Sequence, residues 1–303
     1  MARVAIVGST ASGKSEVAME VARRAPAVHL VSVDSMQVYR RMDIGTAKPS
    51  RQDRAEVAHH CIDLVEPDHD FTVAQFKAAH AAALDEIGRA GGWALLVGGT
   101  GLYHRVVVDD FDLPGEWPEV RAEFESIDDT VNLHERLARL DPAAAAKIES
   151  TNRRRVVRAL EVTVGSGRPF SSFGPGVDAY PGSPVVQIGL RRPRPVLAER
   201  IADRVRLMFE HGLVEEVRSI AADPGFSRTS AQALGYKEIL ELLEGRIGQD
   251  EAVDMIITRT RQFAVRQDRW FRRDPRVRWI DVEHDPVAEV VPAVLDVLDR
   301  QLR

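Results

Sequence analysis

Short apolar runs alternate with amphipathic stretches in the N-terminal part of the chain. The runs at 4–7, 29–33 and 93–97 are apolar enough to be buried strands. Between them, 13–24 and 71–90 space their apolar residues as helices do. Strands separated by helices indicate parallel βαβ units, in which ligands bind at the carboxyl ends of the strands.

The pattern changes between 113 and 182, where no strand-like apolar run occurs. Four short helical segments follow one another at 119–126, 133–140, 142–149 and 153–164. The next stretch, 165–184, is rich in Gly, Pro and Ser, which is typical of a loop. We therefore expect a helical insertion domain that returns the chain to the sheet.

Helices dominate the C-terminal part, between two further strands. The strands are predicted at 184–190 and 277–281. The helices are predicted at 195–212, 213–222, 236–243, 250–272 and 287–302. The expected organisation is a core domain formed by 1–112 and 183–303, with the insertion domain at 113–182.

A phosphate-binding loop follows the first predicted strand. Residues 8–15 read Gly-Ser-Thr-Ala-Ser-Gly-Lys-Ser, the G-x-x-x-x-G-K-[ST] pattern between a strand and a helix. Backbone N–H groups of such a loop face an anion, Lys14 adds a positive charge, and the Ser15 hydroxyl can hold Mg²⁺. The fold class is therefore α/β, a P-loop NTPase-like parallel sheet flanked by helices. The loop predicts a di- or triphosphate ligand and leaves open whether that ligand is a nucleotide.

Three separate segments converge on one edge of the predicted sheet. Gly13 follows the first strand, Asp34 the second and Thr100 the third. A carboxylate beside a phosphate site can take a proton from a nucleophile or hold Mg²⁺. The alternative interpretation of Asp34 is a helix N-cap.

Positive charge is concentrated locally on a chain that is acidic overall. The net charge is −5, from 41 Lys and Arg against 46 Asp and Glu. Two arginine clusters stand out: Arg259, Arg261, Arg266, Arg269, Arg272 and Arg273, and Arg153, Arg154, Arg155 and Arg158. Local basic patches indicate a polyanion partner, although such runs are also found on solvated helix faces.

Several classes of protein are disfavoured by composition. The single cysteine, Cys61, fits a reducing cytosol, and no Cys or His cluster has zinc spacing. No apolar run approaches the roughly 20 residues of a membrane span, so we expect no membrane partner. The chain enters its first strand at once, so we expect no signal peptide and a cytoplasmic location.

An ordered set of motifs resembles the bacterial-type tRNA dimethylallyltransferases, also called tRNA isopentenyltransferases, over essentially the whole chain. The motifs are the loop at 8–15, Asp-Ser-Met-Gln-Val-Tyr at 34–39, Met-Asp-Ile-Gly-Thr-Ala-Lys-Pro at 42–49, Gly-Gly-Thr-Gly-Leu-Tyr at 98–103, Arg-Ala-Leu-Glu at 158–161, Leu-Gly-Tyr-Lys-Glu at 234–238 and Thr-Arg-Gln-Phe-Ala-Val-Arg-Gln at 260–267. The resemblance implies transfer of a dimethylallyl group to the exocyclic N6 amine of adenosine 37, 3′ of the anticodon. The acceptors would be tRNAs that read codons beginning with U, and pyrophosphate would be released.

The resemblance also assigns roles to residues of this chain. Dimethylallyl diphosphate would occupy the loop in place of ATP, and the implied catalytic residues are Asp34 as general base, Thr100 and Lys14. The implied diphosphate-binding residues are Gly8, Thr10, Ala11, Ser12, Gly13, Lys14, Ser15 and Arg204. The last assignment has Arg200 and Arg206 as close alternatives. The implied tRNA-binding residues are Asp34, Ser35, Met36, Gln37, Thr100, Arg121, Asn152, Arg153, Arg154, Arg155, Val156, Gln232, Gly235, Tyr236, Lys237, Arg261 and Arg266. Mg²⁺ is the implied cofactor, with Ser15 as its protein ligand, and a monomer is expected.

The sequence departs from the family pattern at Ser9, where proline is common, at Arg41, where glycine is common, and at Val265, where lysine is common.

Three other functions remain open. A small-molecule kinase shares the loop and the acidic residue but has no need of the arginine-rich segment. A prenyltransferase acting on free adenine nucleotides shares the N-terminal half, and a non-enzymatic RNA-binding protein needs neither Lys14 nor Asp34.

Overall fold

The computed structural model describes residues 4–174 and 176–302, and the chain forms two compact units. The core unit comprises Met1–Val108 and Gly182–Arg303, and the insertion unit comprises Asp109–Pro181. The sequence placed the insertion at 113–182. Each unit has its own hydrophobic core, so each is described by itself below.

The core unit is built on a parallel sheet of six strands in the order β3-β2-β4-β1-β5-β6. The strands are β1 (Val4–Gly8), β2 (Val28–Val33), β3 (His59–His60), β4 (Trp93–Gly98), β5 (Val186–Arg191) and β6 (Val277–Asp281). This arrangement confirms the predicted α/β class. The edge strand β3 was not predicted, because two residues are too few to form an apolar run.

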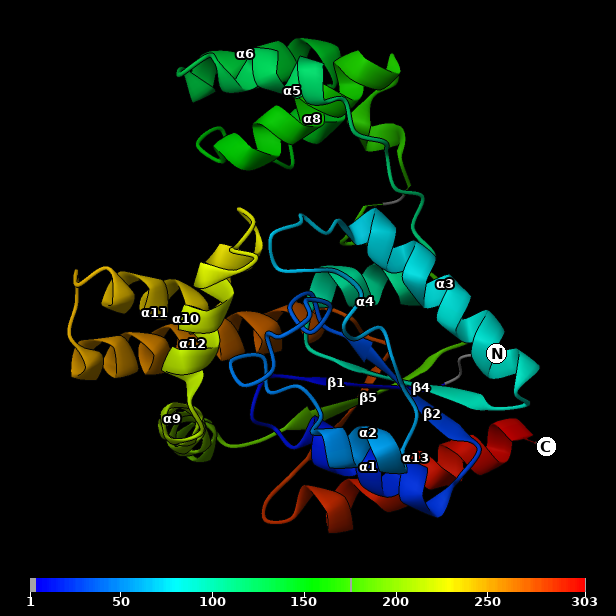
Figure 1. Ribbon diagram of the computed structural model, residues 1–303. Coiled ribbons are helices and arrows are strands. Elements are labelled where there is room, and N and C mark those ends of the chain that lie inside the picture. The colour runs from blue at the N-terminus through cyan, green and yellow to red at the C-terminus, as the bar shows by residue number, and fades with distance from the viewer. Residues whose placement is uncertain (1–3, 175, 303) are drawn as a thin grey trace. The chain divides into compact units, whose positions relative to one another are not determined.

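Helices cover both faces of the sheet (Figure 1). On one face, α1 (Lys14–Arg24) and α13 (Pro286–Leu302) pack side by side and bury apolar residues against β1, β2 and β4. On the other face, α3 (Val73–Arg89) and α4 (Gly101–Val108) pack over the same strands. The short helix α2 (Arg51–Glu56) precedes β3. The four central strands β1, β2, β4 and β5 are largely buried on both sides, which explains why they read as continuous apolar runs.

Four further helices form a layer beside the sheet, coloured yellow-green to orange in Figure 1. They are α9 (Arg194–Glu210), α10 (Leu213–Ala222), α11 (Tyr236–Leu243) and α12 (Gln249–Phe271). The long helix α12 packs on α9 and α11 and also reaches β1 and α4. It therefore brings a segment from late in the chain to the end of the first strand.

The insertion unit is helical, with α5 (Pro118–Glu125), α6 (Thr130–Leu140), α7 (Pro142–Ala145), α8 (Arg153–Ser166) and a 3₁₀ turn at Phe170–Ser172. Its core contains Phe124, Leu133 and Leu160, all fully buried. Helix α7 is shorter than predicted. After Ala145 the backbone tightens into i→i+3 hydrogen bonds from the amides of Lys147 and Ile148, and Ile148 turns into the core.

Candidate active site

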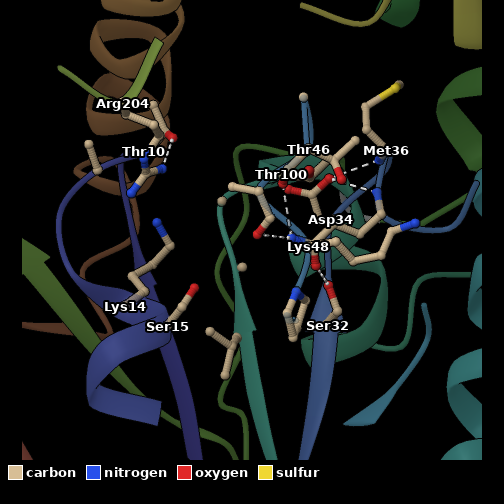
Figure 2. A pocket seen from close by; sticks show the side chains of 18 of the residues that line it. Thr10, Lys14, Ser15, Ser32, Asp34, Met36, Thr46, Lys48, Thr100 and Arg204 are labelled. Atoms are coloured by element: carbon tan, nitrogen blue, oxygen red, sulfur yellow. Dashed lines mark hydrogen bonds between the residues drawn. The ribbon is translucent and has the colours of Figure 1, made fainter. Parts of the chain in front are cut away.

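A cavity of about 860 Å³ lies at the carboxyl ends of β1, β2 and β4. Its walls come from the phosphate loop, the segments that follow β2 and β4, and the helices α9 and α12. Gly13, Asp34 and Thr100 all line it. Figure 2 shows Lys14 and Ser15 on one side of this cavity, with Asp34 and Thr100 across from them.

The phosphate loop has a backbone that side chains would disturb. Gly8 has φ 144°, and a Cβ there would lie 2.7 Å from the Leu190 carbonyl oxygen. Gly13 has φ 104°, and a Cβ there would lie 2.6 Å from Pro286. Both positions therefore require glycine. Within the loop, the buried Ser12 hydroxyl has no hydrogen-bond partner among the described residues.

Two cations meet at the loop. The Lys14 ammonium donates to the Ser9 carbonyl over 2.6 Å. The Arg204 guanidinium donates to the Thr10 hydroxyl over 3.3 Å (Figure 2). Burial and, next, the charge of Arg204 lower the pKa of Lys14 to about 7. Burial also lowers the pKa of Arg204. Buried cations whose pKa values are lowered in a cavity mark a candidate anion site, because a bound anion would favour their charged forms.

The three arginines considered for the diphosphate lie in different surroundings. Arg200 donates to the Ala11 carbonyl over 3.0 Å and to the Glu16 carboxylate over 2.9 Å. Arg206 is exposed and pairs with Asp203, one turn away on the same helix. Arg204 is the one of the three that lines the cavity.

Asp34 directly follows β2 and lines the cavity. Its Oδ1 atom accepts hydrogen bonds from the amides of Met36 at 2.8 Å and Gln37 at 3.3 Å. No helix begins there in the described part of the chain, so Asp34 is not a helix N-cap. Burial raises the pKa of Asp34, and its two amide partners and Lys14 oppose that rise. Its Oδ2 atom accepts no hydrogen bond from the described residues, which leaves it available to a substrate proton.

Thr100 is fixed to the segment that carries this carboxylate. Its hydroxyl accepts the amide hydrogen of Ser35 over 3.2 Å. The close approach of the two segments depends on Gly98, where a Cβ would lie 2.1 Å from the Val33 carbonyl oxygen. The ends of β2 and β4 are therefore packed backbone against backbone.

The loop at 42–49 is anchored by side chains whose structural roles the sequence did not reveal. Gln37 accepts from the Ser32 hydroxyl over 2.7 Å and donates to the Thr46 carbonyl over 3.1 Å. The buried ammonium of Lys48 pairs with Asp43 at 2.8 Å and Asp63 at 2.7 Å. A buried lysine of this kind is stable only because two carboxylates neutralise it.

Glu216 on α10 is a further anchor of this loop, and the sequence did not predict it. Its carboxylate accepts from the amides of Asp43 at 3.0 Å and Ile44 at 2.8 Å, and from the Tyr236 hydroxyl at 2.6 Å. A Cβ at Gly45 would lie 2.4 Å from the Tyr236 ring. This contact joins a loop glycine to a tyrosine that is distant in the sequence, so no local sequence pattern reveals it.

Some of the core-unit residues that the sequence assigned to tRNA binding line the cavity, and others do not. Gln232, Gly235 and Arg266 line it, as do all four residues of 34–37. Tyr236 is buried beneath the loop just described. Lys237 follows it on α11 and is partly exposed. Arg261 donates to the Ala198 carbonyl over 3.1 Å, which ties α12 to α9.

The arginine cluster of the insertion unit divides into two kinds of residue. Arg153 donates to the Glu125 carbonyl over 2.8 Å, and Arg158 pairs with the buried Glu161 at 2.7 Å. Arg154 and Arg155 are exposed, and their guanidinium groups make no hydrogen bond within the described residues. The other assigned residues have local contacts: Arg121 pairs with Glu125, Asn152 caps α8, and Val156 is buried.

The residues present fit a magnesium ion that takes most of its ligands from phosphate oxygens and water. Ser15 is exposed in the first turn of α1 and lines the cavity. No group of three acidic, histidine or cysteine side chains among the described residues could hold a metal ion. Mg²⁺ commonly takes one or two protein oxygens and completes its shell with phosphate oxygens and water, and Ser15 can supply one such oxygen.

Comparison with known proteins decides the family. The IPP transferase family model matches residues 37–274, and the isopentenyl transferase model matches residues 1–63. A tRNA dimethylallyltransferase from Streptomyces avermitilis is 43% identical over 302 residues, covering 98% of this chain and 96% of the relative. The chain belongs to the tRNA dimethylallyltransferase family. Its members are prenyltransferases, so the predicted enzyme class is confirmed.

Other members and solved structures agree with this assignment. The tRNA dimethylallyltransferase of Thermobifida fusca is 46% identical, covering 91% of this chain and 89% of its own. The full-length tRNA isopentenylpyrophosphate transferase of Bacillus halodurans superposes with a TM-score of 0.71 at 37% identity, covering 99% of this chain and 97% of its own. A eukaryotic dimethylallyltransferase shares the fold with a TM-score of 0.83 at 23% identity, covering 100% of this chain and 80% of its own. In the described part of this family member, no helix is both long and apolar enough to cross a membrane.

Proposed function

We propose that this chain transfers the dimethylallyl group of dimethylallyl diphosphate to the N6 amine of adenosine 37 in tRNAs that read codons beginning with U. The products are N6-isopentenyladenosine and pyrophosphate. The observation that carries the proposal is one cavity with two cations on one side and the Asp34 carboxylate on the other. A leaving anion and a departing proton need groups of this kind on opposite sides of the reacting carbon.

The chemistry divides between the two sides of the cavity. The N6 lone pair attacks the first carbon of the allylic chain, and the bond from that carbon to the diphosphate oxygen breaks. Lys14 and Arg204 stabilise the charge that collects on the leaving diphosphate. The Asp34 carboxylate accepts the proton that N6 loses. Without such an acceptor the exocyclic amine would be a poor nucleophile.

A Mg²⁺ ion, when bound, would neutralise part of the diphosphate charge as a Lewis acid. Ser15 would hold it from the first turn of α1. The amides of the phosphate loop and the positive end of that helix bind the rest of the anion.

The acceptor base has to leave its stack in the anticodon loop to enter the cavity. The residues at 34–37, together with Gln232, Gly235 and Arg266, line the cavity that would receive it. Exposed arginines of the insertion unit, Arg154 and Arg155, supply positive charge for tRNA phosphates. We propose a cytoplasmic location and a monomer as the working form.

A double-label experiment tests the donor and the acceptor together. Unmodified tRNA is incubated with the protein, Mg²⁺ and either dimethylallyl diphosphate tritiated in the allylic chain or ATP labelled in its γ-phosphate. We expect tritium in the tRNA and no phosphate transfer. Tritium in added AMP but not in tRNA would favour a free-nucleotide prenyltransferase, and transfer of labelled phosphate would favour a kinase.

A further inference from the structure

A buried glutamine on α12, Gln267, joins the phosphate loop to the turn after β4. Its side-chain oxygen Oε1 accepts from the Thr10 amide over 2.8 Å. Its nitrogen Nε2 donates to the Gly99 carbonyl over 2.9 Å. Gln267 is 6% exposed; its hydrogen bond to Gly99 is buried and its hydrogen bond to Thr10 is partly buried. One amide group thus bridges two backbone segments that leave different strands.

Each of these segments leads to one half of the proposed reaction. The Thr10 hydroxyl accepts from Arg204, on the diphosphate side. On the other side, Thr100 follows Gly99 and accepts from the Ser35 amide, next to the base Asp34. The bridge through Gln267 therefore sets the separation between the donor loop and the segment that holds the base.

The fit around this side chain is tight. A Cβ on Gly99 would lie 2.3 Å from the Gln267 Nε2 atom, although the Gly99 backbone is not in the left-handed region. Gly99 is thus needed for space rather than for backbone freedom. The bridge also needs an acceptor and a donor on one planar group. Methionine offers no donor, and an ionised glutamate offers no donor for the Gly99 carbonyl.

We propose that Gln267 is a positioning residue that holds the donor diphosphate and the general base in register, an inference that rests on the function proposed above. Gln267 lines the cavity, but both polar atoms of its side chain are bonded to the backbone. Its proposed effect is therefore on the geometry of the two segments that it joins. Misplacement of reacting groups by about 1 Å costs on the order of 100-fold in rate, so a bridge of two hydrogen bonds has a large kinetic consequence.

Replacement by the similarly sized but non-bridging methionine tests the proposal. For Gln267→Met we expect the single-turnover rate at saturating donor and tRNA to fall by about 10- to 100-fold. We expect the Kd for inorganic pyrophosphate with Mg²⁺ to rise about fivefold, the effect of one hydrogen bond that no longer orders the loop. The Kd for tRNA should stay within about twofold of the unmodified protein, because Gln267 is buried.

Gln187 provides a matched control. It is 1% exposed on β5, its Oε1 atom accepts from the His104 ring nitrogen Nε2 at 2.7 Å, and it lies outside the cavity lining. Gln187→Met should lower the midpoint of thermal unfolding while the single-turnover rate of the folded protein stays unchanged. If the two variants lose rate in proportion to their loss of stability, Gln267 is merely structural and the proposal is overturned.

A double-mutant cycle addresses the same contact from the other side. Gly99→Ala should displace the Gln267 amide and lower the rate as Gln267→Met does. The combined variant should lose little more than the worse single variant, because both changes break one bridge. Fully additive losses, or a normal rate in folded Gln267→Met, would overturn the proposal.

If the unmodified protein transfers no dimethylallyl group, the proposed function fails by itself. In that case the pyrophosphate affinity of Gln267→Met still tests the bridge. A weakened affinity would support its role in ordering the phosphate loop, and an unchanged affinity would overturn it.

Discussion

Ser35 donates its amide to the Thr100 hydroxyl over 3.2 Å, which joins the segment after β2 to the turn after β4. The residue before Ser35 is Asp34, whose Oδ1 is held by the Met36 amide. The carboxylate is therefore held in place by backbone groups on its own segment and by a neighbouring strand end. A general base needs such restraint, because its geometry relative to the substrate proton determines its efficiency.

Replacement of Asp34 by asparagine should remove the proton acceptor while keeping the local turn. An asparagine oxygen can still accept from the Met36 amide. We expect turnover of Asp34→Asn to fall by roughly 10²–10⁴-fold, with tRNA affinity largely retained. Asp281, which ends β6 in an exposed ion pair with Arg191, offers a matched control, and Asp281→Asn should keep its activity. Near-normal turnover of Asp34→Asn would remove the assignment of Asp34 as the base.

The raised pKa of Asp34 predicts the acid limb of the pH–rate profile. The proposed base can act only when ionised, so the single-turnover rate should increase as the pH rises through this raised pKa. The midpoint should lie above about 3.9, the ordinary value for aspartate. Measured at saturating donor and tRNA, the same limb should be absent from the residual activity of Asp34→Asn. Its persistence in that variant would assign the limb to another group.

Lys14 predicts that pyrophosphate binding depends on pH. In the free protein its pKa is about 7, and a bound anion raises it. Below pH 7 the ammonium is already charged. Above pH 7, Lys14 must take up a proton when pyrophosphate binds, so the affinity for pyrophosphate should decrease by up to about tenfold per pH unit. Calorimetric titrations of pyrophosphate across this range measure the effect. Subtracting the profile of Lys14→Met removes the titration of pyrophosphate itself, and identical profiles for the two proteins would contradict the prediction.

Glu216 should stabilise the fold through the loop it anchors. Its carboxylate accepts from the Ile44 amide and from the Tyr236 hydroxyl. Glu216→Gln replaces one acceptor oxygen by a donor that faces these groups. We expect the free energy of unfolding to decrease by about 1–3 kcal/mol, the range for a buried polar group that has lost its hydrogen-bond partner. The exposed neighbour Glu215, paired with Arg218, is the control, and denaturant unfolding of Glu215→Gln should match the unmodified protein. Equal stability of both variants would contradict the proposed anchor.

Arg154 and Arg155 predict the salt dependence of tRNA binding. Phosphate contacts release counterions, with a slope of about −0.7 to −0.9 per phosphate in a plot of log K against log salt. Replacing both arginines by alanine should weaken binding and flatten this slope by roughly 1–2 units. Arg206, exposed on α9 and paired with Asp203, is a control in the core unit. If the slope is unchanged in Arg154→Ala/Arg155→Ala, these arginines are solvated surface residues.

The sequence predicted the elements that local patterns determine. Five of the strands follow apolar runs or a motif, and Gly13, Asp34 and Thr100 could be placed at one edge because parallel strands end there together. The two-residue strand β3 escaped because it has no pattern of its own.

The supports of the site could not be predicted in the same way. Glu216 bonds to the Ile44 amide across 172 sequence positions, and Gln267 bonds to the Thr10 amide across 257. Both contacts join a side chain to a distant backbone amide, and an amide carries no residue-specific signal in the sequence. The same reason explains why Arg153 and Arg154 look alike in the sequence, although the structure uses the first to bind backbone carbonyls of the insertion unit.

The most direct test of the central claim is mass spectrometry of a tRNA product. An unmodified transcript of a tRNA that reads a codon beginning with U is incubated with the protein, Mg²⁺ and dimethylallyl diphosphate, and then cut into oligonucleotides and nucleosides. The account predicts one added five-carbon dimethylallyl group, located on the adenosine 3′ of the anticodon and recovered as N6-isopentenyladenosine. An unmodified transcript, or a group added to another nucleotide, would contradict it.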